Sequence, residues 1–483
     1  MVTEKFRRQL RQESEKWWSE GLIDATVHEQ LAQRYQFQNL EKDASNRFIT
    51  ILMSLGGILL GLAVITFVAA NWQDWTRGFK VVLLLSLFVG VNAAGFYLWR
   101  SPSPKGYQKL GHGLLLLGAL ILGANIALMA QMFHQTGDFY ELLLVWGLGV
   151  VMMAHGLRLV SLSILSLILL SIGYVLGWFD WTGGQASLPW QLIVIHMPLI
   201  ATLLFLPLAY WSGSRVLFGF SAVLTATALT LNGLPWGWDG GNPTSGWGMA
   251  IACTVPPALL WSFSSDLWRF SRTPRRASSP VAPPQPFQAI ARSLSLVGLS
   301  FILYLFSFRG LWLSPTGSPS LFFVSSPFSW QSLIDLLLFS LVAGLGWLAL
   351  ARQKRSRFQE KFLNSGFVAV MLLLLAGVFV LNFEISPFPD LSTFLINVLL
   401  FLLAIGLIRD GLALGHRQTF WGGILLLVLG ILSRTVEYDT DLLLKSIAFA
   451  ACGIGVILAG LWFERKIKLH PPKFVQASQE KNP

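Results

Sequence analysis

Long apolar segments recur along the whole chain, and they constrain its fold more than any other feature of the sequence. A helix of about 20 apolar residues spans the hydrocarbon core of a bilayer. The sequence therefore predicts an all-α, polytopic transmembrane helix bundle of about 14 spans. We expect these spans at 48–70, 79–99, 110–133, 140–156, 159–178, 190–211, 214–232, 246–263, 290–308, 331–351, 361–383, 391–408, 418–433 and 442–463.

The composition also indicates a membrane protein. The mean hydropathy is +0.60 and 12% of the 483 residues are charged, against about 25% in soluble domains. A net charge of +11 would suggest nucleic acid as the partner of a soluble protein. Here the basic residues lie beside the spans, where they set topology and attract anionic lipid. We therefore expect the chain to contact the lipid bilayer, with anionic lipid at the cytosolic face, and no nucleic acid.

Lysine and arginine crowd every second gap between the expected spans. The gap at 264–289 contains Arg269, Arg272, Arg275 and Arg276, and the next basic gap contains Arg352, Lys354, Arg355, Arg357 and Lys361. The opposite gaps contain only Arg77, Lys80, Arg309, Arg434 and Lys445. Because cytosolic loops carry the excess of basic residues, this alternation predicts that both termini are cytosolic.

The gaps and tails divide the chain into five expected regions. These are a cytosolic amphipathic helical hairpin at 1–47, a first membrane bundle of eight spans at 48–263, a Pro/Ser-rich cytosolic linker at 264–289, a second membrane bundle of six spans at 290–463 and a basic cytosolic tail at 464–483. The linker composition is typical of a flexible segment.

The N-terminal region predicts two short helices. Phe6, Leu10 and Trp17 lie near one helical face, and Gly21 can end the first helix. Thr26 and Glu29 have the spacing of a capping box for the second helix. A hairpin of this size cannot hold a large core alone. We therefore expect it to dock on the membrane, on the chain's own loops or on a protein partner.

The sequence carries no motif of a familiar catalytic or cofactor site. The patterns GxxxxGK(S/T), GxSxG and HExxH do not occur. Cys253 and Cys452 each lie within an apolar run, which indicates neither a disulfide nor a thiolate metal site. We therefore expect no catalytic residues, no cofactor and no metal.

Ionisable residues are rare within the expected spans. Asp335 lies about one turn into the tenth span, near its outer end, where it does not resemble a proton relay. His134 and His196 lie toward the outer side. We interpret them as hydrogen-bonded interfacial histidines, although a histidine pair there can in principle ligate haem. Coupling to protons or sodium is therefore not favoured by the sequence.

The most polar intramembrane stretch is the end of the third span, ANIALMAQMFHQTGDFY. With the turn after the first span, it gives a candidate polar site at the outer face: Asn71, Trp72, Asn125, Gln131, His134 and Asp138. Its amides either join helices or line a small cavity. Because a desolvated amide needs a partner, we expect Gln131 to face the protein interior, near Asn71 or an adjacent span.

Three segments of the chain form a recognisable pattern: WWSEGLIDATVHEQLAQRY, GGILLGLAVITFVAANWQDW and AQMFHQTGDFYELLLVW. Together they resemble a known bacterial membrane-protein family, domain of unknown function 2157. The matching positions are Trp18, Gly21, Leu22, Ile23, Leu31, Arg34, Tyr35, Ala69, Ala70, Asn71, Trp72, Ala130, Gln131, Phe133, Gly137, Asp138 and Trp146. The resemblance covers about the first third of the chain. It implies a polytopic membrane protein and no established activity.

These features favour a multi-pass protein of the bacterial cytoplasmic (inner) membrane. The function that we expect is non-enzymatic, either transporter-like or as a membrane scaffold. The alternative is an envelope enzyme that processes lipid or saccharide, with Asp74 in its first outer loop as the catalytic carboxylate.

Overall fold

The structure of the chain is a computed structural model. It describes residues 4–35, 70, 74–101, 105–182, 188–234, 238–239, 242–243, 246–264, 287–312, 330–352, 363–385, 387–438 and 441–469. The chain divides into two compact units, Met1–Leu87 and Phe88–Pro483. The expected first span at 48–70 and most of the linker and C-terminal tail lie outside the described residues.

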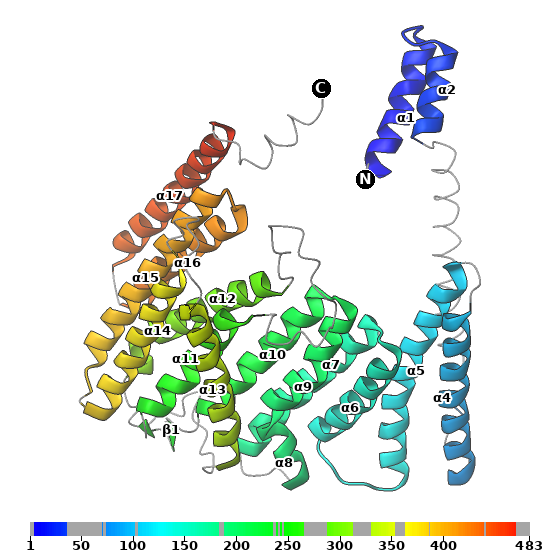
Figure 1. Ribbon diagram of the computed structural model, residues 1–483, viewed down its shortest axis with the longest axis horizontal. Helices are drawn as coiled ribbons and strands as arrows, with labels where there is room; N and C mark the ends of the chain where they lie inside the picture. The colour runs from blue at the N-terminus through cyan, green and yellow to red at the C-terminus, as the bar shows by residue number, and fades with distance from the viewer. Residues whose placement is uncertain are drawn as a thin grey trace. The chain divides into compact units, whose positions relative to one another are not determined.

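The N-terminal hairpin consists of α1 (Glu4–Ser19) and α2 (Ala25–Arg34), as expected (Figure 1). Trp18 stacks on His28, with 5.1 Å between the ring centroids, and this contact joins the two helices. Trp17, Trp18 and Leu22 remain exposed. The side chain of Phe6 lies outside the described part of the hairpin. The hairpin therefore presents aromatic surface that its own small core does not cover.

Gly21 ends α1 as predicted, in a left-handed conformation with φ +73°. The N–H of Leu22 donates to the carbonyl of Trp17 at 2.9 Å, and the N–H of Gly21 donates to that of Trp18 at 3.1 Å. This is the hydrogen-bond pattern of a Schellman motif. The predicted capping box at Thr26 is wrong, because the Asp24 side chain caps α2 by accepting from the N–H of Ala25.

The remaining described helices follow one another along the chain. They are α4 (Arg77–Arg100), α5 (Lys105–Met132), α6 (Phe139–Leu157), α7 (Val160–Thr182), α8 (Leu188–Ile195), α9 (Met197–Ser212), α10 (Arg215–Gly233), α11 (Gly246–Ser262), α12 (Gln288–Phe306), α13 (Trp330–Arg352), α14 (Ser365–Val380), α15 (Pro389–Leu414), α16 (Arg417–Glu437) and α17 (Leu442–Leu469). A 3-10 turn, η3 (Arg309–Leu311), follows α12, and a π-helical turn, η4 (Leu381–Ile385), ends α14. Two-residue strands, β1 (Trp238–Asp239) and β2 (Asn242–Pro243), pair in the α10–α11 connection.

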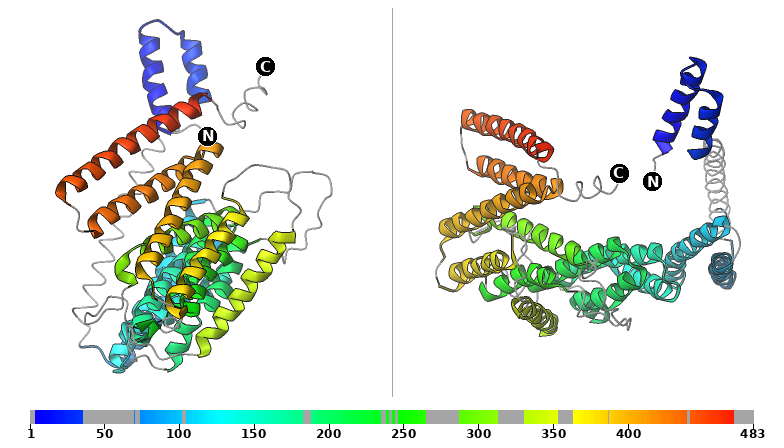
Figure 2. Two further views of the ribbon diagram at one scale, coloured as in Figure 1. Left: turned by 90° about the vertical axis from the view of Figure 1, so that its left-hand side faces the viewer. Right: turned by 45° about the horizontal axis from the view of Figure 1, so that its top comes forward.

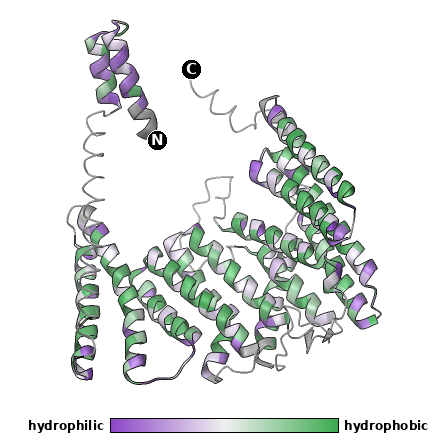
Figure 3. Ribbon diagram, turned by 180° about the vertical axis from the view of Figure 1, so that it is seen from behind, coloured by the Kyte–Doolittle hydropathy of each residue, from purple (hydrophilic) through white to green (hydrophobic). Residues whose placement is uncertain are grey.

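Every expected span from 79–99 onward overlaps a described helix. Among the described residues, 11 helices are long and apolar enough to cross a membrane, or 12 if the bent pair α8–α9 counts as one span. Figure 3 shows the contrast between these apolar helices and the hydrophilic α1 and α2. The chain is therefore an all-helical membrane protein apart from its short strand pair, while the count of 14 spans stays a prediction.

Two expected spans differ in shape from single straight helices. The span at 190–211 is broken into α8 and α9, which meet at an angle of 68°. The span at 361–383 ends in the π-helical turn η4, where the Asn382 side chain accepts hydrogen bonds from the N–H of Phe388 and the hydroxyl of Ser392, both at 3.0 Å. The Asn382 side chain therefore connects the end of this span to the start of α15.

Two large clusters of buried apolar side chains hold most of the helices from α5 onward, and a small third cluster around Phe420 and Ile424 packs α15, α16 and α17 together. The first draws on α5 to α10 and on Phe287 and Ala291 at the start of α12. The second draws on α11, α12, α14, α15 and α16. α11 connects them, because Leu260 belongs to the first cluster and Met249 and Cys253 to the second. A boundary between two bundles in the linker at 264–289 stays a prediction.

α11 is the most enclosed helix of the second cluster. Its 17 residues contact α10, α12, α13 and α14. The hydroxyl of Ser295 donates to the carbonyl of Pro257 at 2.6 Å, and the indole of Trp347 donates to the carbonyl of Ala258 at 3.0 Å. By contrast, α17 packs beside α16 (Figure 2) and has no buried residue in its most apolar stretch. α11 therefore organises the bundle, whereas α17 presents its apolar surface outward.

Candidate functional site

A proline breaks the span that contains α8 and α9. Pro198 is the second residue of α9, and its ring nitrogen cannot donate to the carbonyl of Val194. Proline also clashes with the carbonyl four residues earlier, so a helix bends or ends at this point. The break leaves backbone carbonyls at the end of α8 and backbone N–H groups at the start of α9 without helical partners.

Side chains from neighbouring helices satisfy the carbonyls at the end of α8. The amide nitrogen of Asn232, on α10, donates to the carbonyl of Val194 at 3.2 Å and to that of Ile195 at 2.8 Å. The hydroxyl of Tyr174, on α7, donates to the Asn232 amide oxygen at 2.9 Å. Both polar side chains are buried. Because an unpaired polar group is costly in this environment, these bonds stabilise the break.

A buried carboxylate from α13 meets the start of α9. Nδ1 of His196, the residue between α8 and α9, lies 3.0 Å from Oδ1 of Asp335. The backbone N–H of Leu199 also interacts with this carboxyl group. Asp335 is 3% exposed, and its second oxygen, Oδ2, is buried with no hydrogen-bond partner among the described atoms. The carboxylate therefore caps the positive end of α9 from another helix.

Sequence reasoning missed the His196–Asp335 pair, as it missed the break beside it. Asp335 is buried and paired rather than simply close to the outer end, and the two residues are 139 positions apart. The signal that could have located half of it is Pro198, which follows His196 by two residues inside an apolar run. Ionisable residues within membrane spans face protein or water, and they commonly mark functional sites.

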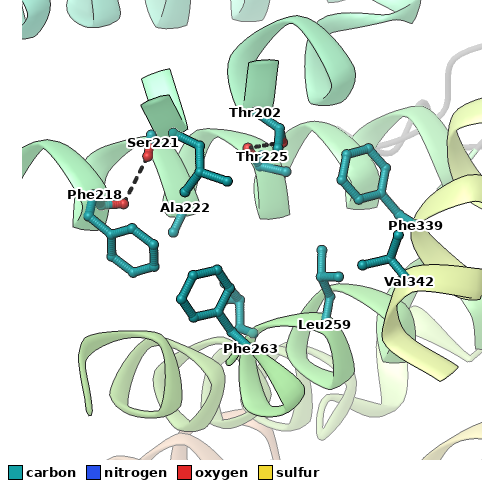
Figure 4. Close-up of a pocket in the computed structure, with 11 residues that line it drawn as sticks. Thr202, Phe218, Ser221, Ala222, Thr225, Leu259, Phe263, Phe339 and Val342 are labelled. Carbon is teal, nitrogen blue, oxygen red and sulfur yellow. Dashed lines mark hydrogen bonds between the residues drawn. The ribbon is translucent and has the colours of Figure 1, made fainter. Parts of the chain in front are cut away.

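A pocket of about 80 Å³ lies between α9, α10, α11 and α13 (Figure 4). Phe218, Phe263 and Phe339 contribute aromatic rings to its wall. The hydroxyls of Thr202 and Thr225 form a hydrogen bond of 3.3 Å with each other. One water needs only about 10–15 Å³, so the pocket has room for several waters or a small organic molecule.

The pocket and the buried pair share helix faces. On α13, Phe339 and Val342 follow Asp335 by four and seven residues, which is the spacing of one helical stripe. On α9, Thr202 and Leu206 follow Leu199 by three and seven residues. The carboxylate that caps α9 therefore stands at the end of the same two faces that form the pocket wall.

The sequence-predicted site is only partly described. Asn71 and Trp72 lie outside the described residues. Asn125 is buried in α5, as expected of an amide that joins helices. Gln131 is exposed, so the expectation that its side chain faces the protein interior is wrong. The physical reason is that Gln131 lies in the last turn of α5, where its amide does not need a protein partner.

His134 and Asp138 belong to the turn between α5 and α6, and both are exposed. His134 has φ 49°, and its N–H donates to the carbonyl of Gln131 at 3.3 Å. The N–H of Gln135 donates to the carbonyl of Ala130 at 2.9 Å. These bonds form a second Schellman motif, which explains the left-handed histidine. Asp138 occupies the N-cap position of α6 without a side-chain capping bond.

The carboxylate of the enzyme alternative, Asp74, lies in the turn before α4 and is exposed. The neighbouring residues 71–73 lie outside the described part of the chain. Among the residues that the structure describes, no three His, Cys, Asp or Glu side chains gather in a geometry suited to a metal ion. The described residues thus place Asp74 in solvent-accessible surroundings and not in a buried catalytic cluster.

Two of the basic residues in predicted outer gaps take part in ion pairs. Nε of Arg309 lies 2.7 Å from Oδ1 of Asp390. Arg434 pairs with Glu437, donates to the backbone carbonyl of Ser307 and packs over the ring of Phe308 at 4.4 Å. These arginines therefore fasten the turn after α12 to α15 and α16, which explains why they depart from the charge alternation.

Comparison with known proteins reaches the N-terminal third of the chain. No curated protein and no solved structure matches it. Residues 15–163 match the family described as "Predicted membrane protein (DUF2157)". This range contains the end of α1, all of α2 and helices α4 to α6, and it includes all six residues of the sequence-predicted site. The match confirms the resemblance over residues 15–163, which are similar to this family of predicted membrane proteins.

Proposed function

We propose that this chain is a non-enzymatic, transporter-like membrane protein whose binding region is the α8–α9 break and the pocket beside it. The observation that carries the proposal is the buried carboxylate of Asp335, hydrogen-bonded to His196 at the break. Many transporters bind their substrates where a transmembrane helix is discontinuous, because the half-helix ends supply polar backbone groups. The mixed lining of apolar rings and hydroxyls suits a small, largely apolar molecule with one hydrogen-bonding group.

Cysteine accessibility tests the pocket directly. Ser221 lines the pocket and is buried, and its replacement by cysteine changes the side chain by one atom. In a chain that also carries Cys253→Ala and Cys452→Ala, Ser221→Cys should react with a small, membrane-impermeant thiol reagent. Ser163→Cys is the matched control, because Ser163 is equally buried but lies on α7, away from the pocket.

A short-chain alcohol at a saturating concentration serves as the probe ligand for the pocket. The alcohol should slow the reaction of Ser221→Cys and leave a surface cysteine unaffected. Equal reactivity at positions 221 and 163 would count against a water-accessible pocket. Reaction at position 221 that no small amphipathic molecule slows would argue that the pocket is a packing defect.

The second candidate function, a membrane scaffold, is favoured by the exposed aromatic surface of the hairpin. Trp17, Trp18 and Leu22 need a covering surface, which a protein partner could supply. Deletion of residues 1–40 should leave membrane insertion intact, because the expected spans lie downstream. It should remove co-purifying partners or change the oligomeric state. If the truncated chain fails to insert, the hairpin serves the fold and the scaffold function loses its support.

The enzyme alternative depends on Asp74 alone. Replacement of an exposed carboxylate by its amide leaves a fold unchanged, so Asp74→Asn separates the two classes. An envelope enzyme should lose turnover completely in this variant, whereas a transporter-like protein should keep its function. The same variant should unfold at the temperature of the unmodified chain.

The chain should lie in the bacterial inner membrane with both termini cytosolic, and its basic loops should contact anionic lipid. The alternation of lysine and arginine supports this orientation. Single cysteines at Thr273 and Ser386, both outside the described residues, test it. In intact cells an impermeant reagent should label position 386 and not position 273, and the opposite result would invert the topology.

A further inference from the structure

We propose that the His196–Asp335 pair is a proton-binding site, and that its protonation state controls how firmly α9 is capped. The proposal rests on the proposed function only for its use in transport, since proton binding can be measured without a substrate. It begins from two facts. The pair is buried within the described helices, and Oδ2 of Asp335 has no hydrogen-bond partner among the described atoms.

The 3.0 Å contact between Nδ1 of His196 and Oδ1 of Asp335 is a hydrogen bond, so it contains one proton. With a neutral imidazole and an ionised carboxyl group, the pair carries a net charge of about −1. One further proton from water can bond to Oδ2 of Asp335, the oxygen without a hydrogen-bond partner among the described atoms. The net charge then becomes about 0. The step is a simple protonation, and no bond other than O–H forms.

The donor set suits a proton better than a metal ion. Sodium and divalent cations need several oxygen ligands, and the nearby carbonyls of Val194 and Ile195 already accept from Asn232. The pair itself offers one free carboxylate oxygen and an imidazole. Within the described part of the chain, no third ligand of the usual metal-binding types joins them.

Among the described residues, no ion pair joins His196 or Asp335 to any charged side chain outside the pair. The other titratable or charged side chains on the helices packed around it (α6 to α11 and α13) are Tyr140, Glu141, His155, Tyr174, Asp180, Tyr210, Arg215, Cys253 and Arg352. Of these, only Tyr174 belongs to the hydrogen-bonded network of the break, through Asn232. The arginines lie at the opposite ends of α10 and α13. The N-terminus of α9 is therefore the main feature that stabilises the ionised state.

Protonation should loosen the break. An ionised carboxylate accepts strong hydrogen bonds from a helix N-terminus, and a neutral carboxyl group accepts weaker ones. The start of α9 and the stripe on α13 that carries Phe339 both lead into the pocket. A change at Asp335 should therefore alter access to the pocket, in particular at Ser221.

Infrared difference spectroscopy of the full chain in lipid nanodiscs tests the proton site. Spectra at about pH 5 and about pH 8, a range that spans the ordinary titration of histidine, should differ by the band of a protonated, buried carboxyl group. Asp335→Asn should remove this band. Asp410→Asn is the matched control, because Asp410 is equally buried and bonds the backbone N–H of Leu363 at 3.1 Å, far from His196 in the sequence. A band that persists in Asp335→Asn, or its absence from the unmodified chain, would overturn the proposal.

Labelling of Ser221→Cys at the same two pH values tests the link to the pocket. After correction for thiolate content with an exposed control cysteine, the rate should change at least about fivefold, which corresponds to a modest coupling free energy. Asp335→Asn resembles the neutral carboxyl group, so it should fix the rate near its acid value. If the carboxyl group titrates but the labelling rate of Ser221→Cys does not change with pH, the proposal that Asp335 controls access to the pocket is wrong. If Asp335 titrates but Ser221→Cys does not react at either pH, the result counts against the proposed function and not against the proton-binding site.

Discussion

The polar residues at the end of α5 and those at the α8–α9 break reach their positions in opposite ways. Asn125, Gln131 and His134 follow one another along the chain, but they do not converge, because one is buried and two are exposed. His196 and Asp335 lie 139 positions apart and form a buried hydrogen bond. A run of polar residues in a membrane sequence therefore indicates where a helix ends. A binding site instead requires polar side chains from different helices to lie close together.

The two regions also differ in what their polar groups satisfy. At the end of α5, the Schellman motif completes the backbone hydrogen bonds without any side chain. At the break, Pro198 prevents that solution within an apolar span, and side chains from α10 and α13 replace the missing bonds. Substitutions at the break should consequently cost much more than substitutions at the α5 end.

The largest effect should come from Asn232→Leu. This change leaves the carbonyls of Val194 and Ile195 and the hydroxyl of Tyr174 without their present partner. The loss should lower the free energy of unfolding by about 3 kcal/mol, because each unsatisfied buried group costs about 1–3 kcal/mol. Unfolding in mixed detergent micelles measures it. A cost below about 0.5 kcal/mol would mean that water replaces the amide at the break.

Asp335→Leu should have the next largest effect. It removes the acceptor of His196 and of the Leu199 backbone N–H, and we expect a loss of about 2 kcal/mol. Asp138→Leu is the paired variant at the α5 end, and it should change stability by about 0.5 kcal/mol or less because that carboxylate is exposed. If Asp335→Leu and Asp138→Leu lose similar amounts of stability, the two regions do not differ in how much their polar groups stabilise the fold.

A change of opposite sign should follow from His134→Gly. His134 has φ 49°, a conformation in which glycine has no steric penalty. The substitution should therefore raise the free energy of unfolding by about 0.5–1 kcal/mol. Destabilisation would show instead that the imidazole makes a contact essential to the α5–α6 turn.

Much of the helical architecture could be predicted from the sequence. Apolar length alone located the helices from α4 onward, because the bilayer imposes one length scale on every span. The break between α8 and α9 was not predicted, since the run 190–211 is mostly apolar and Pro198 can also bend a helix without ending it. The cap of α2 was assigned to Thr26 instead of Asp24, an error of two residues in a helix boundary.

The candidate site at the break could not be predicted, because no local pattern relates His196 on one helix to Asp335 on another. Two departures from the charge alternation have a similar explanation. Arg309 and Arg434 lie in predicted outer gaps, where Asp390 and Glu437 balance them. A single sequence shows which residues are unusual for a span, but their partners depend on the packing of helices that are distant along the chain.

The smallest effect should come from Gln131→Leu. Gln131 is exposed in the last turn of α5, so its amide has little desolvation cost to recover. We expect the free energy of unfolding to change by about 0.5 kcal/mol or less, and thiol labelling of the pocket at position 221 to stay the same. The measurement is the same micelle unfolding used for Asn232→Leu. A loss above about 1 kcal/mol, the upper range for an interhelical hydrogen bond in a membrane, would show that Gln131 joins helices after all. Such a loss would also mean that polar side chains stabilise the end of α5 as they stabilise the α8–α9 break.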